Sequence, residues 1–175
     1  TFNHTTASSG GAICSYYNYH VTVVDSTFNH TTSSGSSSSG GGAIYSGGSV
    51  TVISSNFTNT TANNYGGAIY SSASVDVIGS TFNHTTASSS GGAIYNWGGV
   101  VTVVDSTFNH TTASNNGGAI YGSSVNVDDS TFINTTTSST SSSGGAIYSV
   151  NVSVVNSSFI NTTTGRFGGG AIRGD

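Results

Sequence analysis

Residues 41–44 read Gly-Gly-Ala-Ile, and this tetrapeptide occurs seven times in the chain. The alanines of the seven copies are Ala12, Ala43, Ala68, Ala93, Ala119, Ala146 and Ala171. Successive copies lie 25 to 31 residues apart. A spacing in this range is typical of stacked supersecondary units, none of which can bury its apolar side alone. The fold should therefore follow from one unit and from the way the units stack.

Each unit also contains a phenylalanine with a fixed set of neighbours. Val stands seven and five positions before it, Ser two positions before it, and a Thr pair three and four positions after it. The phenylalanines are Phe2, Phe28, Phe57, Phe82, Phe108, Phe132 and Phe159. All length variation falls outside this block, and the longest inserts are residues 14–20 and 33–39. Since loops tolerate insertions and packed strands do not, the block predicts core and the inserts predict loops.

The residue pattern within a unit predicts short strands. Val-x-Val alternation is typical of a strand with one buried face, and Gly-Gly-Ala-Ile-Tyr predicts a second strand whose glycines allow a tight bend. Phe ends or follows a third strand, and no segment has a helical period. Three strands in ~25 residues, stacked in parallel ~4.8 Å apart, predict an all-β parallel β-helix of about seven coils. We expect residues 1–175 to form this single solenoid.

In a β-helix each inward side chain lies on its own copy one coil away. We expect columns of Val, Ile and Phe, in which each buried side chain contributes ~1.5–3 kcal/mol relative to exposure. The Ser two residues before Phe should point inward at a corner and bond to the backbone. This strict register argues against disorder, even though the chain is rich in Ser and Thr and only 5% of its residues are charged.

Charge and hydropathy argue against two further classes, nucleic-acid-binding proteins and membrane-spanning proteins. The net charge is −4 with two basic residues, whereas nucleic-acid binding needs Lys or Arg to neutralise phosphates. No apolar run reaches about 18 residues, so we expect no membrane span in this segment. The sequence begins and ends within a repeat, which indicates a segment of a longer repeat protein.

The alternation of Gly-Gly-Ala-Ile with Phe-x-Asn resembles the repeats of polymorphic outer-membrane proteins and of related adhesin-like surface proteins of bacteria and methanogenic archaea. Phe-x-Asn is literal at Phe57, Phe132 and Phe159, and becomes Phe-Asn-His in units such as that of Phe2. The resemblance spans the whole chain. It implies a secreted, right-handed parallel β-helix used for surface display or adhesion, here without the barrel of the outer-membrane members.

Asn-x-Ser/Thr sequons make N-glycosylation the first candidate modification. Four sequon asparagines directly follow Phe and should face outward, because neighbouring strand residues point to opposite sides; they are Asn3, Asn29, Asn83 and Asn109. We expect glycans on these four in preference to the remaining sequons, which are Asn56, Asn59, Asn134, Asn151, Asn156 and Asn161. Three of the latter stand two residues after Phe and should turn inward or line a corner as a hydrogen-bonded ladder, namely Asn59, Asn134 and Asn161.

A column of tyrosines follows the buried Ile of most units and should form a surface aromatic ladder; its members are Tyr45, Tyr70, Tyr95, Tyr121 and Tyr148. The ladder either covers the coil edge or forms a stripe that binds sugars or a neighbouring fibre. Cys14 takes the tyrosine position in the first unit and has no cysteine partner in the chain, so we interpret it as a small apolar substitute.

Histidines replace Asn two residues after Phe at His4, His30, His84 and His110. Neighbouring imidazoles could share a zinc ion, but no Cys, Asp or Glu recurs beside them to complete a ligand set. Stacked imidazoles that take the place of Asn are the favoured interpretation. A calcium ladder is also disfavoured, because other residues interrupt the column of Asp25, Asp105 and Asp129. We expect no metal and no cofactor.

Uncharged, open-ended repeats with many sequons predict an extracellular structural or adhesive protein: a glycan-decorated stalk, a surface-layer component or a head-to-tail filament. A solenoid end without a polar cap invites pairing with another chain, so we expect end-to-end self-association and glycans that are attached or bound. An enzyme acting on polysaccharides is disfavoured, because the chain has six acidic residues, no Lys and no suitably spaced carboxylate pair.

The alternative function is an ice-binding or carbohydrate-binding β-helix. Ice binding would need a flat, regular array of Thr. The column between the paired valines begins in that way but is interrupted, since it reads Thr22, Thr51, Asp76, Thr102, Asn126 and Ser153. The paired threonines are continuous, but adjacent residues cannot share one face of a regular strand.

Overall fold

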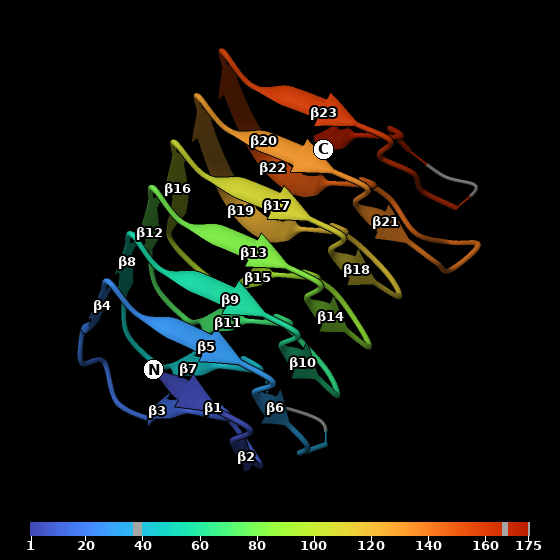
Figure 1. The fold of residues 1–175 in the computed structure, drawn as a ribbon. Helices are drawn as coiled ribbons and strands as arrows, with labels where there is room; N and C mark the ends of the chain where they lie inside the picture. The colour runs from blue at the N-terminus through green and yellow to red at the C-terminus, as the bar shows by residue number, and fades with distance from the viewer. Residues whose placement is uncertain (37–39, 166–167, 175) are drawn as a thin grey trace.

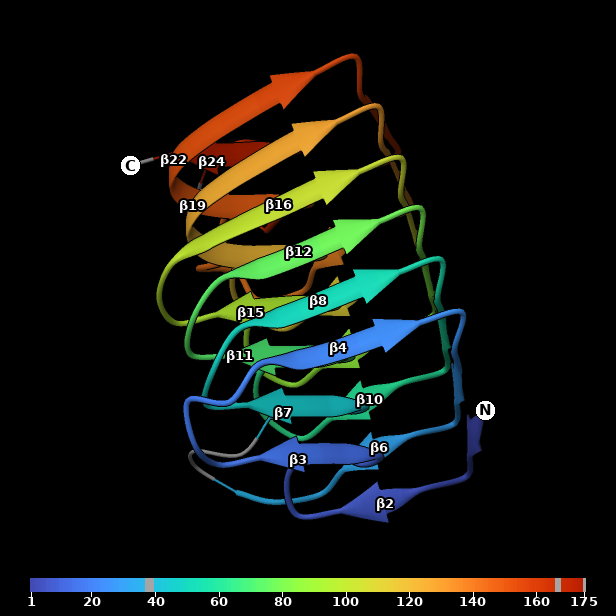
Figure 2. The same cartoon turned by 90° about the vertical axis from the view of Figure 1, so that its left-hand side faces the viewer.

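The computed structural model describes residues 1–36, 40–165 and 168–174, and its regular secondary structure there is entirely β. The chain winds into a parallel β-solenoid of about six turns with about 26 residues per coil, so the predicted fold class is confirmed. Seven Phe strands delimit these six complete turns. Figure 2 shows the valine strands β4 to β16 running left to right as the coils rise from the N-terminus, which is a right-handed winding.

Three parallel sheets line the solenoid. The Phe sheet contains β1 (Phe2–Asn3), β5 (Thr27–Asn29), β9 (Asn56–Thr58), β13 (Thr81–Asn83), β17 (Thr107–Asn109), β20 (Thr131–Ile133) and β23 (Ser158–Ile160). The Thr sheet contains β2 (Thr6–Ala7), β6 (Thr32–Ser33), β10 (Thr61–Ala62), β14 (Thr86–Ala87), β18 (Thr112–Ala113) and β21 (Thr136–Thr137). Figure 1 shows the Thr strands, with loops beyond them, along one edge of the stack.

The third sheet, called the Ile–Val sheet, joins the strands of the tetrapeptide to those of the Val pair. Its tetrapeptide strands are β3 (Ile13–Ser15), β7 (Ile44–Ser46), β11 (Ile69–Ser71), β15 (Ile94–Asn96) and β24 (Ile172–Gly174), and its valine strands are β4 (Val21–Val24), β8 (Val50–Ile53), β12 (Val75–Ile78) and β16 (Val100–Val104). Where only four residues separate the two motifs, they merge into one strand, as in β19 (Ile120–Asp128) and β22 (Ile147–Val155). Of the insert 14–20, residues 16–20 form the expected loop, whereas Cys14 and Ser15 end β3. Of the insert 33–39, Ser33 ends β6, residues 34–36 lie in a loop, and residues 37–39 lie outside the described residues.

Like residues pair with like along the core columns, as predicted. Phe57 pairs with Phe82, Val52 with Val77, and Ile44 with Ile69. The phenylalanine rings stack with centroids 4.6–4.8 Å apart and planes within 9° of parallel. Central members of these columns are fully buried. The core is therefore a set of continuous apolar columns that run the length of the stack.

In six coils the second Thr of the pair and the residue after it form a fourth short strand, which was not predicted from the sequence. The first Thr of a pair points inward and the second lies in the sheet. Within the described residues, the hydroxyls of these inward threonines are buried without a hydrogen-bond partner; they are Thr5, Thr31, Thr60, Thr85, Thr111 and Thr135.

A serine ladder closes the corner before the Phe sheet. The Ser80 hydroxyl donates to the carbonyl of Ile78 at 2.9 Å and accepts the backbone N–H of Ser55 at 3.1 Å. The backbone N–H of Ser80 in turn donates to the hydroxyl of Ser106 at 3.0 Å. The same pattern recurs from Ser26 to Ser157. Each serine thus satisfies backbone groups in two coils, as predicted for this position.

Two further corners of each coil require a left-handed backbone. The residue three before Phe has φ of 45–57° at Asp25, Ser54, Gly79, Asp105, Asp129 and Asn156, and the residue two after Phe has φ of 51–53° at His4, His30, Asn59, His84, His110, Asn134 and Asn161. Gly, Asn, Asp and His adopt this conformation more readily than other residues. The mixed composition of both columns is therefore explained by backbone geometry, with no need for a ligand.

The two glycines of the tetrapeptide meet different demands. Gly66 has φ of 63°, whereas Gly67 sits where the chain passes close to the Thr sheet. A Cβ on Gly67 would overlap the carbonyl oxygen of Gly92 and lie 2.7 Å from the backbone nitrogen of Thr86. The Gly-Gly sequence thus allows one left-handed bend and one close backbone approach.

The corner geometry leads to a stability prediction at Asp105. Replacing Asp105 by Val places a β-branched side chain at a left-handed φ, so we expect the free energy of unfolding to fall by about 1–2 kcal/mol, whereas Asp105→Gly should change it by less than about 0.5 kcal/mol. Urea unfolding followed by circular dichroism measures both. Thr102→Val, on a nearby strand, is the control and should change stability by less than about 0.5 kcal/mol. Equal losses for Asp105→Val and Asp105→Gly would contradict the corner argument.

Candidate functional site

The tyrosine ladder is the most extended aromatic feature on the outside of the Ile–Val sheet. Its rings stack with centroids 4.8–5.4 Å apart and planes within 12° of parallel. Because the faces of neighbouring rings cover one another, the middle of the ladder presents ring edges and hydroxyls to solvent. Stacking of a sugar on a ring face is therefore restricted to places where the ladder is interrupted. Its role as a binding stripe stays a prediction.

At both ends of the ladder, another residue occupies the tyrosine position. Cys14 pairs in register with Tyr45, and Arg173 pairs with Tyr148. Next to Cys14, which is an exposed free thiol, the ring of Tyr16 lies 5.6 Å from that of Tyr45 with its plane tilted by 51°. The aromatic contact that Cys14 lacks is thus partly replaced by a residue of the following loop.

One further tyrosine contacts the ladder from the loop before Gly-Gly. Tyr65 directly precedes Gly66, and its ring lies 4.5 Å from that of Tyr95, with the planes inclined by 37°. This cover leaves Tyr95 only 4% exposed, whereas the other ladder tyrosines are half-buried. Burial raises the pKa of the Tyr95 phenol, and the charges that Tyr121 and Tyr65 would carry on ionisation raise it further.

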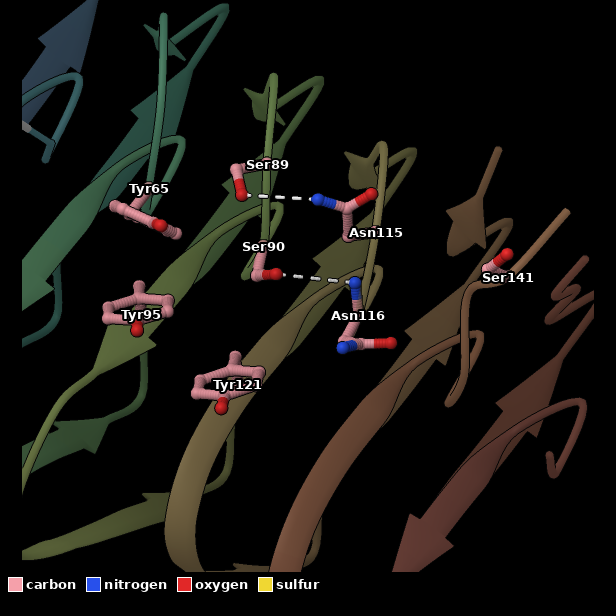
Figure 3. A pocket seen from close by; sticks show the side chains of 8 residues that line it. All are labelled: Tyr65, Ser89, Ser90, Tyr95, Asn115, Asn116, Tyr121 and Ser141. Carbon is pink, nitrogen blue, oxygen red and sulfur yellow. Dashed lines mark hydrogen bonds between the residues drawn. The ribbon is translucent and has the colours of Figure 1, made fainter. Parts of the chain in front are cut away.

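A groove of about 300 Å³ lies between the ladder and the loops that precede Gly-Gly. Its lining consists of Tyr65, Ser89, Ser90, Tyr95, Asn115, Asn116, Tyr121 and Ser141. Figure 3 shows the three tyrosines along one side and the serines and asparagines along the other. The lining combines aromatic rings with neutral hydroxyl and amide groups. We call this feature the Tyr65 groove.

The polar side of the Tyr65 groove is held by hydrogen bonds between coils. The Asn115 amide donates to the Ser89 hydroxyl at 3.3 Å, and the backbone N–H of Asn116 donates to the Ser90 hydroxyl at 3.3 Å. The side-chain oxygen of Asn116 accepts the backbone N–H of Ser143 at 3.0 Å. These contacts fix the orientation of both amides before any ligand arrives.

The four sequon asparagines that follow Phe lie on the outer side of the Phe sheet. Asn3 is exposed and the other three are half-buried. The Asn29 amide nitrogen donates to the side-chain oxygen of Asn3 at 3.1 Å, and Asn109 donates to Asn83 over the same distance. Their side chains form short ladders along the stack, and their glycosylation stays a prediction.

Of the two placements expected for the Asn two residues after Phe, the structure shows the corner. Asn59 and Asn161 are exposed and Asn134 is half-buried, so none turns into the core. The Asn161 amide donates to the side-chain oxygen of Asn134 at 3.2 Å, and the Asn134 amide nitrogen lies 3.2 Å from Nε2 of His110. Since both sets of sequons are on the outside, exposure alone does not separate them.

The histidines stack in pairs in the same corner column. The rings of His84 and His110 lie 4.7 Å apart with planes 2° from parallel, and those of His4 and His30 are also 4.7 Å apart. A metal ion binds in the plane of an imidazole, so lone pairs in two parallel planes converge poorly on one ion. Within the described residues, no group of three or more His, Cys, Asp or Glu is placed to hold a metal.

Comparisons with known proteins identified no relative of this chain. No protein-family model matches the chain, and no match was found among curated proteins or solved structures. In the described part of the chain, no helix is long and apolar enough to cross a lipid bilayer. The resemblance to surface-protein repeats therefore stays a prediction based on the motifs themselves.

Sequence reasoning missed the Tyr65 groove. Its members come from loops of different length, and no fixed spacing links them to the ladder. One signal was available, because Tyr65 is a large residue immediately before Gly-Gly, where the following units have Ser90 and Asn116. Only the structure shows that the ring leans toward the next coil.

The raised pKa of Tyr95 leads to a prediction about alkaline stability. The fold favours the protonated phenol, so this contribution is complete below the ordinary tyrosine pKa of about 10 and is lost as pH rises toward the higher folded-state pKa. We expect the free energy of unfolding to fall as the pH rises above about 10, and Tyr95→Phe to reduce that fall by up to ~1.4 kcal/mol per pH unit. Urea unfolding across this range measures both.

Tyr19→Phe is the matched control, because Tyr19 is 71% exposed. It should leave the pH dependence of unfolding unchanged. If Tyr95→Phe and the wild type lose stability in parallel, burial of the Tyr95 phenol does not contribute to the alkaline transition.

Proposed function

We propose that this chain is part of an extracellular structural and adhesive protein, in which the solenoid serves as a glycan-decorated stalk or surface-layer element. The observation that supports this most is the continuous register of the coils. Phe, Val and Ile columns run through the stack, and each coil is hydrogen-bonded to the next. Such a body is a rigid spacer that grows in length by ~4.8 Å with every added coil.

The outer surface fits an extracellular spacer. Side chains facing out from the Phe sheet are mainly Thr and Asn, and only 5% of the whole chain is charged. The coil tolerates length variation only in its outer loops, so surface features can differ between coils while the core stays the same. The Phe-x-Asn and Gly-Gly-Ala-Ile motifs, which resemble those of surface adhesins, have clear roles in this architecture as corner and close-packing residues.

The function that we propose does not include catalysis. The Tyr65 groove is lined by Tyr, Ser and Asn, which supply neither a carboxylate pair nor a histidine base. Ice binding has less support, because the outward column of Thr22 and Thr51 continues with Asp76 and Asn126. Carbohydrate binding is the alternative that a specific feature favours, namely this groove.

Surface location and glycosylation can be tested together on native cells. Brief protease treatment of intact cells should release peptides of this chain, because we place it outside the membrane. Mass spectrometry of those peptides should find N-linked sugar at outward sequons, including Asn83 and Asn109. A cytoplasmic protein treated in parallel is the control and should stay intact. Recovery of this chain only after cell lysis would contradict the extracellular assignment, and peptides without sugar would contradict the glycan coat.

We also infer that copies of this segment associate end to end. Adjacent coils pair Phe with Phe, Val with Val and Ile with Ile, so the face of one coil matches the face of the next. A second copy of the segment stacks on the first in the register of its own coils.

Sedimentation velocity tests this association. The isolated segment should form oligomers whose size grows with concentration, because pairing buries the end columns. Val154→Lys places a charge in the end contact and should give monomers, whereas Ser153→Lys adds the same charge to an outward, exposed position and should still associate. Circular dichroism checks that both variants fold. A wild-type segment that stays monomeric up to ~100 μM, a concentration well above a micromolar dissociation constant, would contradict end-to-end pairing.

A further inference from the structure

We propose that the Tyr65 groove is a binding site for a neutral, linear, β-linked glycan that lies along the solenoid axis. This inference rests on the proposed adhesive function and names the class of ligand that such an adhesive surface would hold. It is carried by the shape of the groove, by the polar groups inside it and by the absence of charge among its lining residues.

The groove exists because the residue directly before Gly-Gly is large in one coil and small in the next two. Gly66 and Gly91 donate their backbone N–H groups to the carbonyls of Ser90 and Asn116, so the residues before Gly-Gly lie one coil apart. Tyr65 fills its place in this column with a ring that leans toward Tyr95. Above it, Ser90 and Asn116 are too small to fill the same volume. The Tyr65 ring therefore ends the groove at one side, and the free space continues over the next two coils.

Polar groups in the groove have hydrogen-bonding capacity left for a ligand. The side-chain oxygen of Asn116 is engaged by Ser143, and Figure 3 shows its amide nitrogen on the side of Tyr121, within the groove. The hydroxyls of Ser89 and Ser90 act as acceptors for asparagine donors, so each still has its own hydrogen to donate. The side-chain oxygen of Asn115 remains as an acceptor. Ligands with many hydroxyls, which donate and accept, match this set.

The chemistry of the groove disfavours ionic ligands and peptide strands. The lining consists of Tyr, Ser and Asn, none of which carries a charge at neutral pH. An ionic ligand would lose hydration in the groove without gaining a counter-charge. A peptide strand would need an open backbone edge, but backbone groups along this column already pair between coils, as Gly91 with Asn116 and Gly117 with Ser143 illustrate. A neutral saccharide meets neither obstacle.

The direction of the groove selects a linear ligand. Each coil contributes one ladder tyrosine and one small polar residue to the two sides, so equivalent groups recur every ~4.8 Å along the axis. A sugar ring in an extended β-1,4-linked chain advances by a similar length. Consecutive sugars can therefore meet equivalent side chains on consecutive coils, with the first sugar against Tyr65.

Binding of cellotetraose and chitotetraose to the folded segment, measured by isothermal titration calorimetry, tests the proposal. Both probes are neutral β-1,4-linked chains, and at least one should bind. Tyr65→Ala removes the aromatic end of the groove. Asn116→Asp keeps the oxygen that accepts the Ser143 N–H but replaces the amide donor by a charge. Each variant should weaken binding by about tenfold or more, because a buried polar or aromatic contact is lost.

Matched controls are Tyr19→Ala and Asn18→Asp, which change exposed residues of the 16–20 loop and should bind as the wild type does. Tetragalacturonate, a charged chain of similar length, should not bind. The proposal is overturned if neither neutral probe binds at ~10 mM, which is weaker than the usual range for specific sites, if binding survives in both groove variants, or if tetragalacturonate binds as well as the neutral probes. Such a failure would leave the surface location and glycosylation of the stalk untouched, since those are measured on native cells.

Discussion

Register between coils is the constraint on which the rest of this structure depends. Each coil contributes one Phe, one Ile and two Val to the interior, and every one of them must lie on its equivalent in the next coil to be buried. The phenylalanine rings, 4.6–4.8 Å apart, sit at the spacing of the strands that carry them. A shift of one residue in any strand would turn its whole apolar set outward. The narrow apolar interior therefore specifies the winding.

The corners are where register is secured. A coil of about 26 residues that closes on itself needs sharp bends, and two of those bends use left-handed residues on either side of Phe. The serine ladder adds hydrogen bonds that connect one corner to the next coil, as in the contact of Ser55 with Ser80. Polar residues at the corners thus support the same alignment that apolar residues impose inside.

The sequence was sufficient to predict the parts of the fold that follow from period and insertion pattern. The columns of Phe82, Val77 and Ile69, the serine corner and the position of the loops could all be predicted, because packed positions do not change length. The strand at the Thr pair was missed because it has two residues and no alternation. The corner columns could be located but not explained, since Asp, Asn, His and Gly share a backbone preference and no single side-chain chemistry. The Tyr65 groove depends on the tilt of one ring, which no spacing encodes.

The backbone hydrogen bonds between coils point along the solenoid axis, and this has a mechanical consequence. Tension applied between the two ends loads the bonds of an end coil in line with the pull, while coils further inside keep both neighbours. Coils should then peel away one after another, and each releases about 26 residues, or ~85–95 Å of extended chain. A stalk with this architecture lengthens in many small steps under load, so that it dissipates energy while most of its length remains folded.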